Sequence, residues 1–138
     1  MIGSRILAAG RAHLVVPWRH LGRTPAGLDC IGLVLLAAAA AGLSLEDPAP
    51  YAREPASQRL RQGIAAHLDA VPLNALAEGD LLVFNMGLYA GHLGLYGTHP
   101  TYAAASVLHA YLPRRAVVEE LLEPMRPSLT GAYRWRQG

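Results

Sequence analysis

Residues 29–43 of the chain read DCIGLVLLAAAAAGL, and this stretch decides the fold. Its apolar run, residues 31–43, is shorter than the roughly 18 to 20 residues that a membrane-spanning helix needs, so we expect a buried helix of a soluble protein. Asp29 can accept hydrogen bonds from the unpaired N–H groups of a first helical turn, and Gly42 is a typical helix end. The sequence therefore predicts a buried helix that begins at Cys30 and stops at Gly42.

Helices precede strands along the rest of the chain. Before the cysteine, an apolar stripe predicts a helix over residues 4–16, which Pro17 ends, and after it residues 56–68 read as an exposed helix. Beyond Pro72 the pattern changes to short strands, which we expect at 80–85, 92–96, 105–111, 116–120 and 132–136. Helices followed by neighbouring strands indicate an α+β domain with an antiparallel sheet.

The composition excludes several classes of protein. The chain has 138 residues, of which 52% are hydrophobic and 16% charged, so we expect one folded domain over residues 1–138. The net charge is only +2 and the arginines are scattered, so we expect no direct contact with nucleic acid. Arg11 and His13 interrupt the N-terminal apolar run, so we expect no signal peptide and no membrane span. The single cysteine, Cys30, excludes an internal disulfide.

Cys30 lies where a cysteine nucleophile gains from its surroundings. The first turn of a helix carries partial positive charge and a neighbouring imidazolium adds more, and both stabilise a thiolate over a thiol. Free cysteine is also a common small, buried apolar residue, and position alone leaves that alternative open.

Two of the six histidines lie in neighbouring predicted strands. His92 opens the strand HLGLY, and His109 comes late in the strand SVLHAY. In a hairpin whose paired residue numbers sum to 201, His92 stands opposite His109 on one face. With Cys30 they match the nucleophile, base and orienting group of a catalytic triad. A zinc site built from the same three side chains is the competing hypothesis, but no short ligand spacing marks it, and we expect no metal or other cofactor.

Four stretches of the chain match one known family in order and spacing, and together they cover nearly the whole sequence: PWRHLGRTPAGLDCIGLV (17–34), EGDLLVF (78–84), AGHLGLY (90–96) and VLHAY (107–111). They resemble the NlpC-type family of papain-like cell-wall peptidases, especially the compact single-domain members of phage tails and phage-like gene transfer agents. The resemblance implies a papain-like fold in which the nucleophile helix packs on an antiparallel β-sheet.

The resemblance also implies roles for the three candidate residues. Cys30 falls on the family's nucleophile, His92 on its general base and His109 on the residue that orients the base. Family members hydrolyse peptide bonds in peptidoglycan stems, commonly between D-glutamate and diaminopimelate. In that mechanism the Cys30 thiolate attacks the carbonyl, and His92 protonates the leaving amine and then activates water to hydrolyse the thioester. The expected oxyanion donor is the backbone N–H of Cys30.

Four further positions are candidates for oxyanion or substrate contacts. Trp18 stands where the family often has tyrosine, so its indole N–H either keeps that contact or the ring only packs against the cysteine helix. Ile31 replaces a frequent serine, which removes a polar contact to the substrate. Asp29 keeps the family's acidic residue, as a helix cap, as a contact for a substrate amine, or as both. His20, in the loop before the nucleophile, is placed to line the cleft.

The leading hypothesis is a cysteine endopeptidase that opens peptidoglycan as part of a phage-like tail during DNA delivery. Its expected partners are peptidoglycan stem peptides and the tail-hub or baseplate proteins of the particle. We expect it to be made in the cytoplasm, carried in the tail and active at the recipient's cell wall. The alternatives are a structural tail-hub protein with an inactive peptidase fold, or a related papain-like amidase or acyltransferase. The order of Cys30 before His92 disfavours circularly permuted relatives.

Overall fold

A six-stranded antiparallel sheet carries the fold in the computed structural model, which describes residues 1–51, 57–86 and 89–136. The strands lie in the order β3-β8-β4-β5-β6-β7, so the sheet is built mainly from neighbouring hairpins. Their bounds, in chain order, are β3 Leu68–Ala70, β4 Leu81–Met86, β5 Tyr89–Thr98, β6 Ala105–Tyr111, β7 Ala116–Leu121 and β8 Leu129–Trp135. All five predicted strands begin within three residues of the observed ones, and β6 has the predicted bounds.

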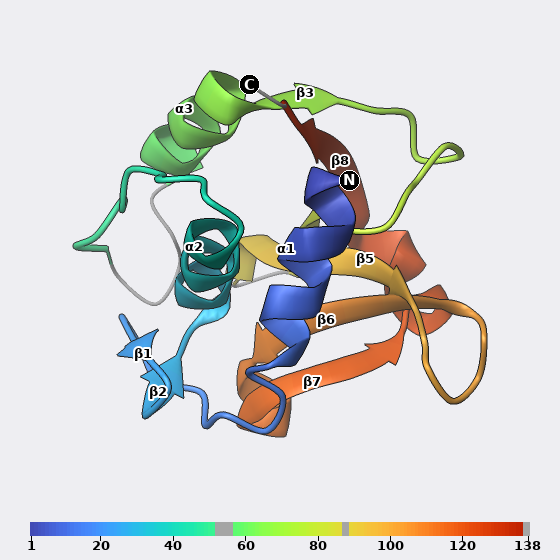
Figure 1. Cartoon of the computed structure of the whole chain (residues 1–138), viewed down its shortest axis with the longest axis horizontal. Coiled ribbons are helices and arrows are strands. Elements are labelled where there is room, and N and C mark those ends of the chain that lie inside the picture. Colours follow the sequence, from blue (N-terminus) through green and yellow to red (C-terminus); the bar gives the residue numbers. More distant parts are fainter. Residues whose placement is uncertain (52–56, 87–88, 137–138) are drawn as a thin grey trace.

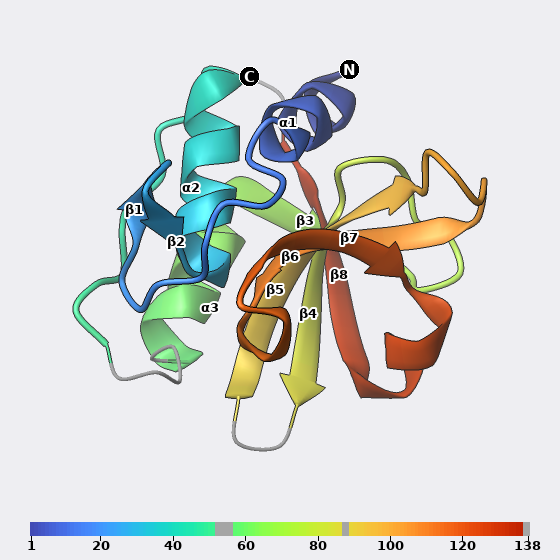
Figure 2. The ribbon, with the colours of Figure 1, turned by 90° about the horizontal axis from the view of Figure 1, so that it is seen from below.

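Three helices lie on one side of this sheet (Figures 1 and 2). They are α1 Ile2–Arg11, α2 Cys30–Ala40 and α3 Ser57–His67. The remaining elements are short: β1 Arg23–Thr24, β2 Gly27–Leu28 and the 3-10 helices η1 Leu112–Arg114 and η2 Glu123–Ser128. None of the helices in the described residues has the length and apolar character needed to cross a bilayer.

Alternating side chains of the strands are buried on opposite faces of the sheet. On the helix side, Leu95 and Leu108 pack with Leu33 of α2 and Leu7 of α1. On the other side, a smaller cluster lies between the sheet and η2, and its members are Leu82, Phe84, Val107, Leu122, Leu129 and Ala132. The period of two in the strands and the apolar character of α2 therefore place α2 on the sheet with no charged residue between them.

The predicted first helix is five residues too long at its C-terminal end. It ends at Arg11, and the backbone of residues 15–18 instead reaches the edge strand β7. The N–H of Val15 donates to the carbonyl of Val117, and the N–H of Val117 donates to the carbonyl of Val16. Leu14 and Val15 are exposed, at 39% and 79%, so the apolar residues of this stretch do not form a buried helix face, which is why periodicity alone misplaced the boundary.

The predicted register of the β5–β6 hairpin is wrong by two residues. Leu95 pairs with Leu108 and Tyr96 with Val107, so the paired numbers sum to 203 rather than 201. A shift of two keeps every side chain on its original face. His92 and His109 are therefore diagonal neighbours on the same face instead of direct partners, and they remain in contact.

Candidate active site

The N-terminus of α2 holds Cys30 at the edge of a cleft of about 240 Å³. Asp29 has an extended backbone, and its Oδ1 accepts a 2.8 Å hydrogen bond from the N–H of Gly32, so the predicted helix cap is confirmed. Cys30 is the first helical residue, as predicted, and is 8% exposed. The cleft also has lining side chains from β5, at His92, and from β6, at Tyr111.

His92 and His109 form a buried pair beside this cleft. Nε2 of His92 lies 2.8 Å from Nδ1 of His109, and the two side chains are 7% and 0% exposed. With Nε2 engaged in this way, Nδ1 is the nitrogen of His92 that remains for a proton transfer. The ring of Tyr111 stacks on His109 at 4.5 Å between centroids and limits its rotation. The structure thus brings together the three residues predicted as a triad.

Burial sets the charge state of the resting site. It lowers the pKa of His92 to about 3, with a further contribution from His109, and it lowers the pKa of His109 as well. Burial and then the charge of Asp29 raise the pKa of the Cys30 thiol to about 12, against backbone hydrogen bonds from Leu93 and Ile31. Both shifts oppose the thiolate expected at the helix start and favour a neutral thiol beside a neutral imidazole in the free protein.

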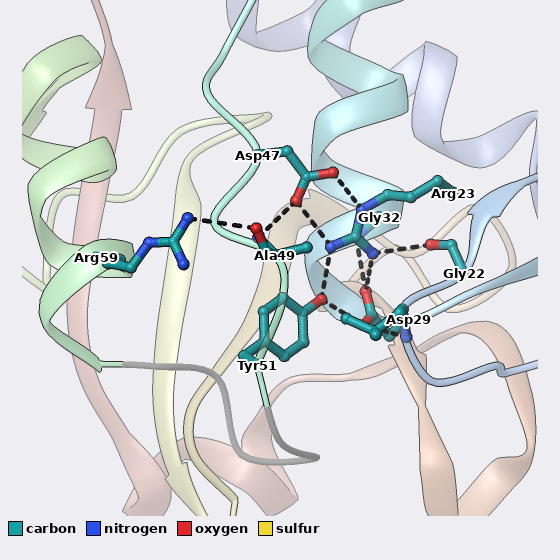
Figure 3. Close-up of polar contacts among 9 residues, drawn as sticks. Gly22, Arg23, Asp29, Gly32, Asp47, Ala49, Tyr51 and Arg59 are labelled. Carbon is teal, nitrogen blue, oxygen red and sulfur yellow. Dashed lines mark hydrogen bonds and ion pairs between the residues drawn. The ribbon is translucent and has the colours of Figure 1, made fainter.

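A network of ion pairs fixes Asp29 in place (Figure 3). Its Oδ1 accepts from Gly32 and from the guanidinium of Arg23 at 2.9 Å, while its Oδ2 accepts from the N–H of Leu21 at 3.0 Å and from the hydroxyl of Tyr51. A carboxylate has about four lone-pair sites, so these donors occupy its capacity. Asp29 is therefore a structural cap that also lines the cleft, and its carboxylate is already bonded to four donors of the protein.

Arg23 and Tyr51 bind Asp29 through contacts that the sequence did not predict. The guanidinium of Arg23 donates to both oxygens of Asp47, at 2.8 and 3.0 Å, and to the hydroxyl of Tyr51 at 2.7 Å (Figure 3). These bonds hold residues 47–51 against the start of α2, and the side chain of Tyr51 is part of the cleft lining. No local motif marks this contact, because it joins segments 22 and 28 residues apart.

The other predicted contact residues differ in their placement. Trp18 lines the cleft with Cys30, and its ring lies 6.5 Å from that of His20. His20 is half-buried behind the lining, between the rings of Trp18 and Tyr51. Ile31 is 2% exposed and lines a separate apolar cavity between α2, α3 and the sheet. The prediction that placed Ile31 at the substrate is not supported by this position, since the helical turn points its side chain into the core.

The competing zinc site has no support in the described residues. Across residues 1–51, 57–86 and 89–136, no three His, Cys, Asp or Glu side chains gather closely enough to hold a metal ion. The facing nitrogens of the two histidines are also committed to each other.

The scaffold and this geometry are those of a papain-like cysteine peptidase: a helix presents the cysteine, and neighbouring antiparallel strands present two histidines. The model of the NlpC/P60 family matches residues 15–123, and the chain belongs to this family. The predicted α+β papain-like fold is thereby confirmed. A search of curated proteins found no match.

Solved structures of similar fold support this placement. One is a protein from Staphylococcus aureus described as similar to lipoprotein, NLP/P60 family, with 21% identity and a TM-score of 0.69; the match covers 99% of this chain and 42% of that one. The second is the NlpC/p60 domain of peptidoglycan hydrolase SagA, with 16% identity and a TM-score of 0.68 over 96% and 97% of the two chains. The third is an N-acetylmuramoyl-L-alanine amidase from Bacteroides uniformis, with 12% identity and a TM-score of 0.69 over 99% of each chain. At these identities the likeness concerns the fold.

Proposed function

We propose that this cysteine peptidase hydrolyses the stem peptides of peptidoglycan. The observation that carries the proposal is that Cys30 and His92 line one cleft of an NlpC/P60 domain and that His109 contacts His92. Two proteins of similar fold are described as a peptidoglycan hydrolase and an N-acetylmuramoyl-L-alanine amidase, which favours a cell-wall substrate.

The site supports a general-base mechanism. Nδ1 of neutral His92 takes the thiol proton of Cys30 as the sulfur attacks the scissile carbonyl, and the resulting imidazolium then protonates the leaving amine. Water activated by His92 hydrolyses the thioester and frees the sulfur. The N–H of Cys30 stands in the first turn of α2, where no helical acceptor exists, so it is the oxyanion donor we propose.

The finer assignments rest on the four matching stretches of sequence. They support the bond between D-glutamate and diaminopimelate as the target, and a place in the tail of a phage-like particle that acts at the recipient's wall. In that setting tail-hub or baseplate proteins hold the enzyme. An amidase that cuts the bond next to muramic acid is the second candidate, favoured by the match to the Bacteroides uniformis structure over 99% of both chains.

Digestion of purified peptidoglycan, followed by mass analysis of the fragments, tests the proposal. The wild type should release fragments cut between D-glutamate and diaminopimelate, and Cys30→Ala and His92→Ala should release none. His67→Ala is the matched control, because His67 ends α3 and does not line the cleft, and it should cut as the wild type does. Stems released whole from muramic acid would show the amidase instead. Intact peptidoglycan after treatment with the wild type would refute both activities.

A further inference from the structure

A row of polar side chains continues from the cleft to the protein surface through the histidine pair. Nε2 of His109 lies 3.1 Å from Oε1 of Glu120. The other oxygen of Glu120 pairs with the guanidinium of Arg114, at distances of 3.1 and 3.2 Å. The side chains become progressively more exposed, from 0% at His109 through 23% at Glu120 to 61% at Arg114. Glu120 is not part of the cleft lining, so it reaches the chemistry only through His109.

The pairing of β6 and β7 explains why Glu120 and His109 meet. Val107 pairs with Glu120 and His109 pairs with Val118, so Glu120 is the diagonal neighbour of His109 on the same face. The adjacent Glu119 points to the other face, where it binds Arg11 and Ser106. Two consecutive carboxylates of one strand therefore have separate surroundings, and only Glu120 contacts the histidines.

We propose that Glu120 is a positioning residue that sets the tautomers of both histidines and so makes Nδ1 of His92 the catalytic base. This inference rests on the proposed function for its consequence in catalysis. The tautomers that it assigns to the two imidazoles do not depend on the substrate.

The tautomers follow from the donor and acceptor chemistry along the row. The hydrogen bond from His109, together with Arg114, lowers the pKa of Glu120, so Glu120 is an ionised carboxylate that only accepts. Nε2 of neutral His109 must then carry its proton, which leaves Nδ1 as an acceptor. Nε2 of His92, 2.8 Å away, must donate to it, and Nδ1 of His92 is left with a free lone pair. The opposite pair of tautomers puts a proton on Nδ1 of His92 and prevents it from accepting one from Cys30.

Glu120 also acts on charge as the reaction proceeds. When His92 becomes an imidazolium, its Nε2–H donates to His109, which in turn donates to the carboxylate of Glu120. The negative charge of Glu120 then stabilises the positive charge of His92, and the ring of His109 lies between them. The charged and titratable groups around His109 are His92 on β5, Glu120 on β7 and Arg114 on η1, with the Tyr111 ring stacked on it. Arg114 opposes the positive charge but holds Glu120 in place, which makes Glu120 the group that decides the tautomer.

Exchange of one carboxylate oxygen for an amide tests the proposal. Glu120→Gln keeps the side-chain size, but an amide both donates and accepts, so it no longer dictates which nitrogen of His109 is protonated. Nitrogen-15 NMR of the imidazoles should show His109 as the Nε2–H tautomer in the wild type and as a mixture in Glu120→Gln. Glu120→Asp, which only accepts, should keep more of the Nε2–H form than Glu120→Gln. Glu119→Gln is the matched control on the same strand and should leave the tautomer unchanged.

The kinetic readout separates positioning from substrate binding. In peptidoglycan digestion, Glu120→Gln should lower kcat roughly ten- to hundredfold, a part of what a general base supplies, with KM unchanged because Glu120 lies outside the cleft. A wild-type tautomer and a wild-type kcat in folded Glu120→Gln would overturn the proposal. If the wild type cuts no peptidoglycan, the proposed function fails, and the NMR comparison still decides the role of Glu120 because it needs no substrate.

Discussion

Loss of the Asp29 carboxylate should destabilise the protein more than loss of any other single charge near the cleft. Asp29→Ala removes the helix cap, worth about 1 kcal/mol. It also leaves Arg23, 21% exposed, without its inner partner, and breaking a buried pair in this way costs roughly 3 to 5 kcal/mol. Because Arg23 keeps both bonds to Asp47, we take about 2 kcal/mol for this part. The total of about 3 kcal/mol corresponds to a fall in Tm of roughly 12 °C for a domain of this size.

Urea and thermal unfolding, followed by far-UV circular dichroism, measure this loss. Asp47→Ala is the matched control, since it removes the outer partner of the same arginine at a carboxylate that is 43% exposed, and it should cost less than about 1 kcal/mol. If Asp29→Ala loses no more stability than Asp47→Ala, then Asp29 is not the structural cap described above, and its carboxylate is again a candidate contact for a substrate.

Three further outcomes follow from the site. Because the pKa of Cys30 is raised to about 12, its alkylation by iodoacetamide should keep accelerating above pH 9, and a plateau reached below pH 8 would contradict the neutral resting pair. The lowered pKa of His92 means that the unfolded chain binds a proton below pH 6.5 and the folded one does not. The contribution of His92 to the free energy of unfolding should therefore be full above pH 6.5 and fall by up to about 1.4 kcal/mol per pH unit towards pH 3 in urea titrations. His92→Gln should flatten this slope. Gly94→Ala places a methyl group against the side chain of Val107 between β5 and β6, and it should lower the free energy of unfolding by about 1 to 3 kcal/mol; unchanged stability would show that the Val107 side chain moves aside without cost.

The sequence was sufficient for the fold class, for the place of Cys30 at the start of α2 and for the shared face of His92 and His109, because each left a local signal. Asp29 before a long apolar run marked the start of α2, and alternating strands marked the sheet. The face shared by His92 and His109 followed from the period of two, although their register did not, since registers that differ by two place the same residues on the same face.

The features that sequence reasoning missed are contacts between distant segments. Tyr51 and Glu120 lie outside the four matching stretches, and Arg23 lies inside one that does not indicate its partners; the contacts of all three form only when the fold brings distant segments together. The raised pKa of Cys30 was not foreseen for a related reason: a helix start is visible in the sequence, but the depth of burial that opposes its effect is not. Ile31 was misplaced because adjacency to Cys30 along the chain does not put its side chain in the same cleft.

The most direct test of the central claim is the mass of the enzyme during turnover. The wild type, mixed with soluble muropeptides and quenched in acid within seconds, should carry an adduct on Cys30 equal in mass to the acyl part of the cleaved stem. Hydroxylamine should remove that adduct, as it does a thioester, and Cys30→Ala should carry none. Release of stem fragments by Cys30→Ala, or by a wild type that never forms an adduct on Cys30, would contradict the account.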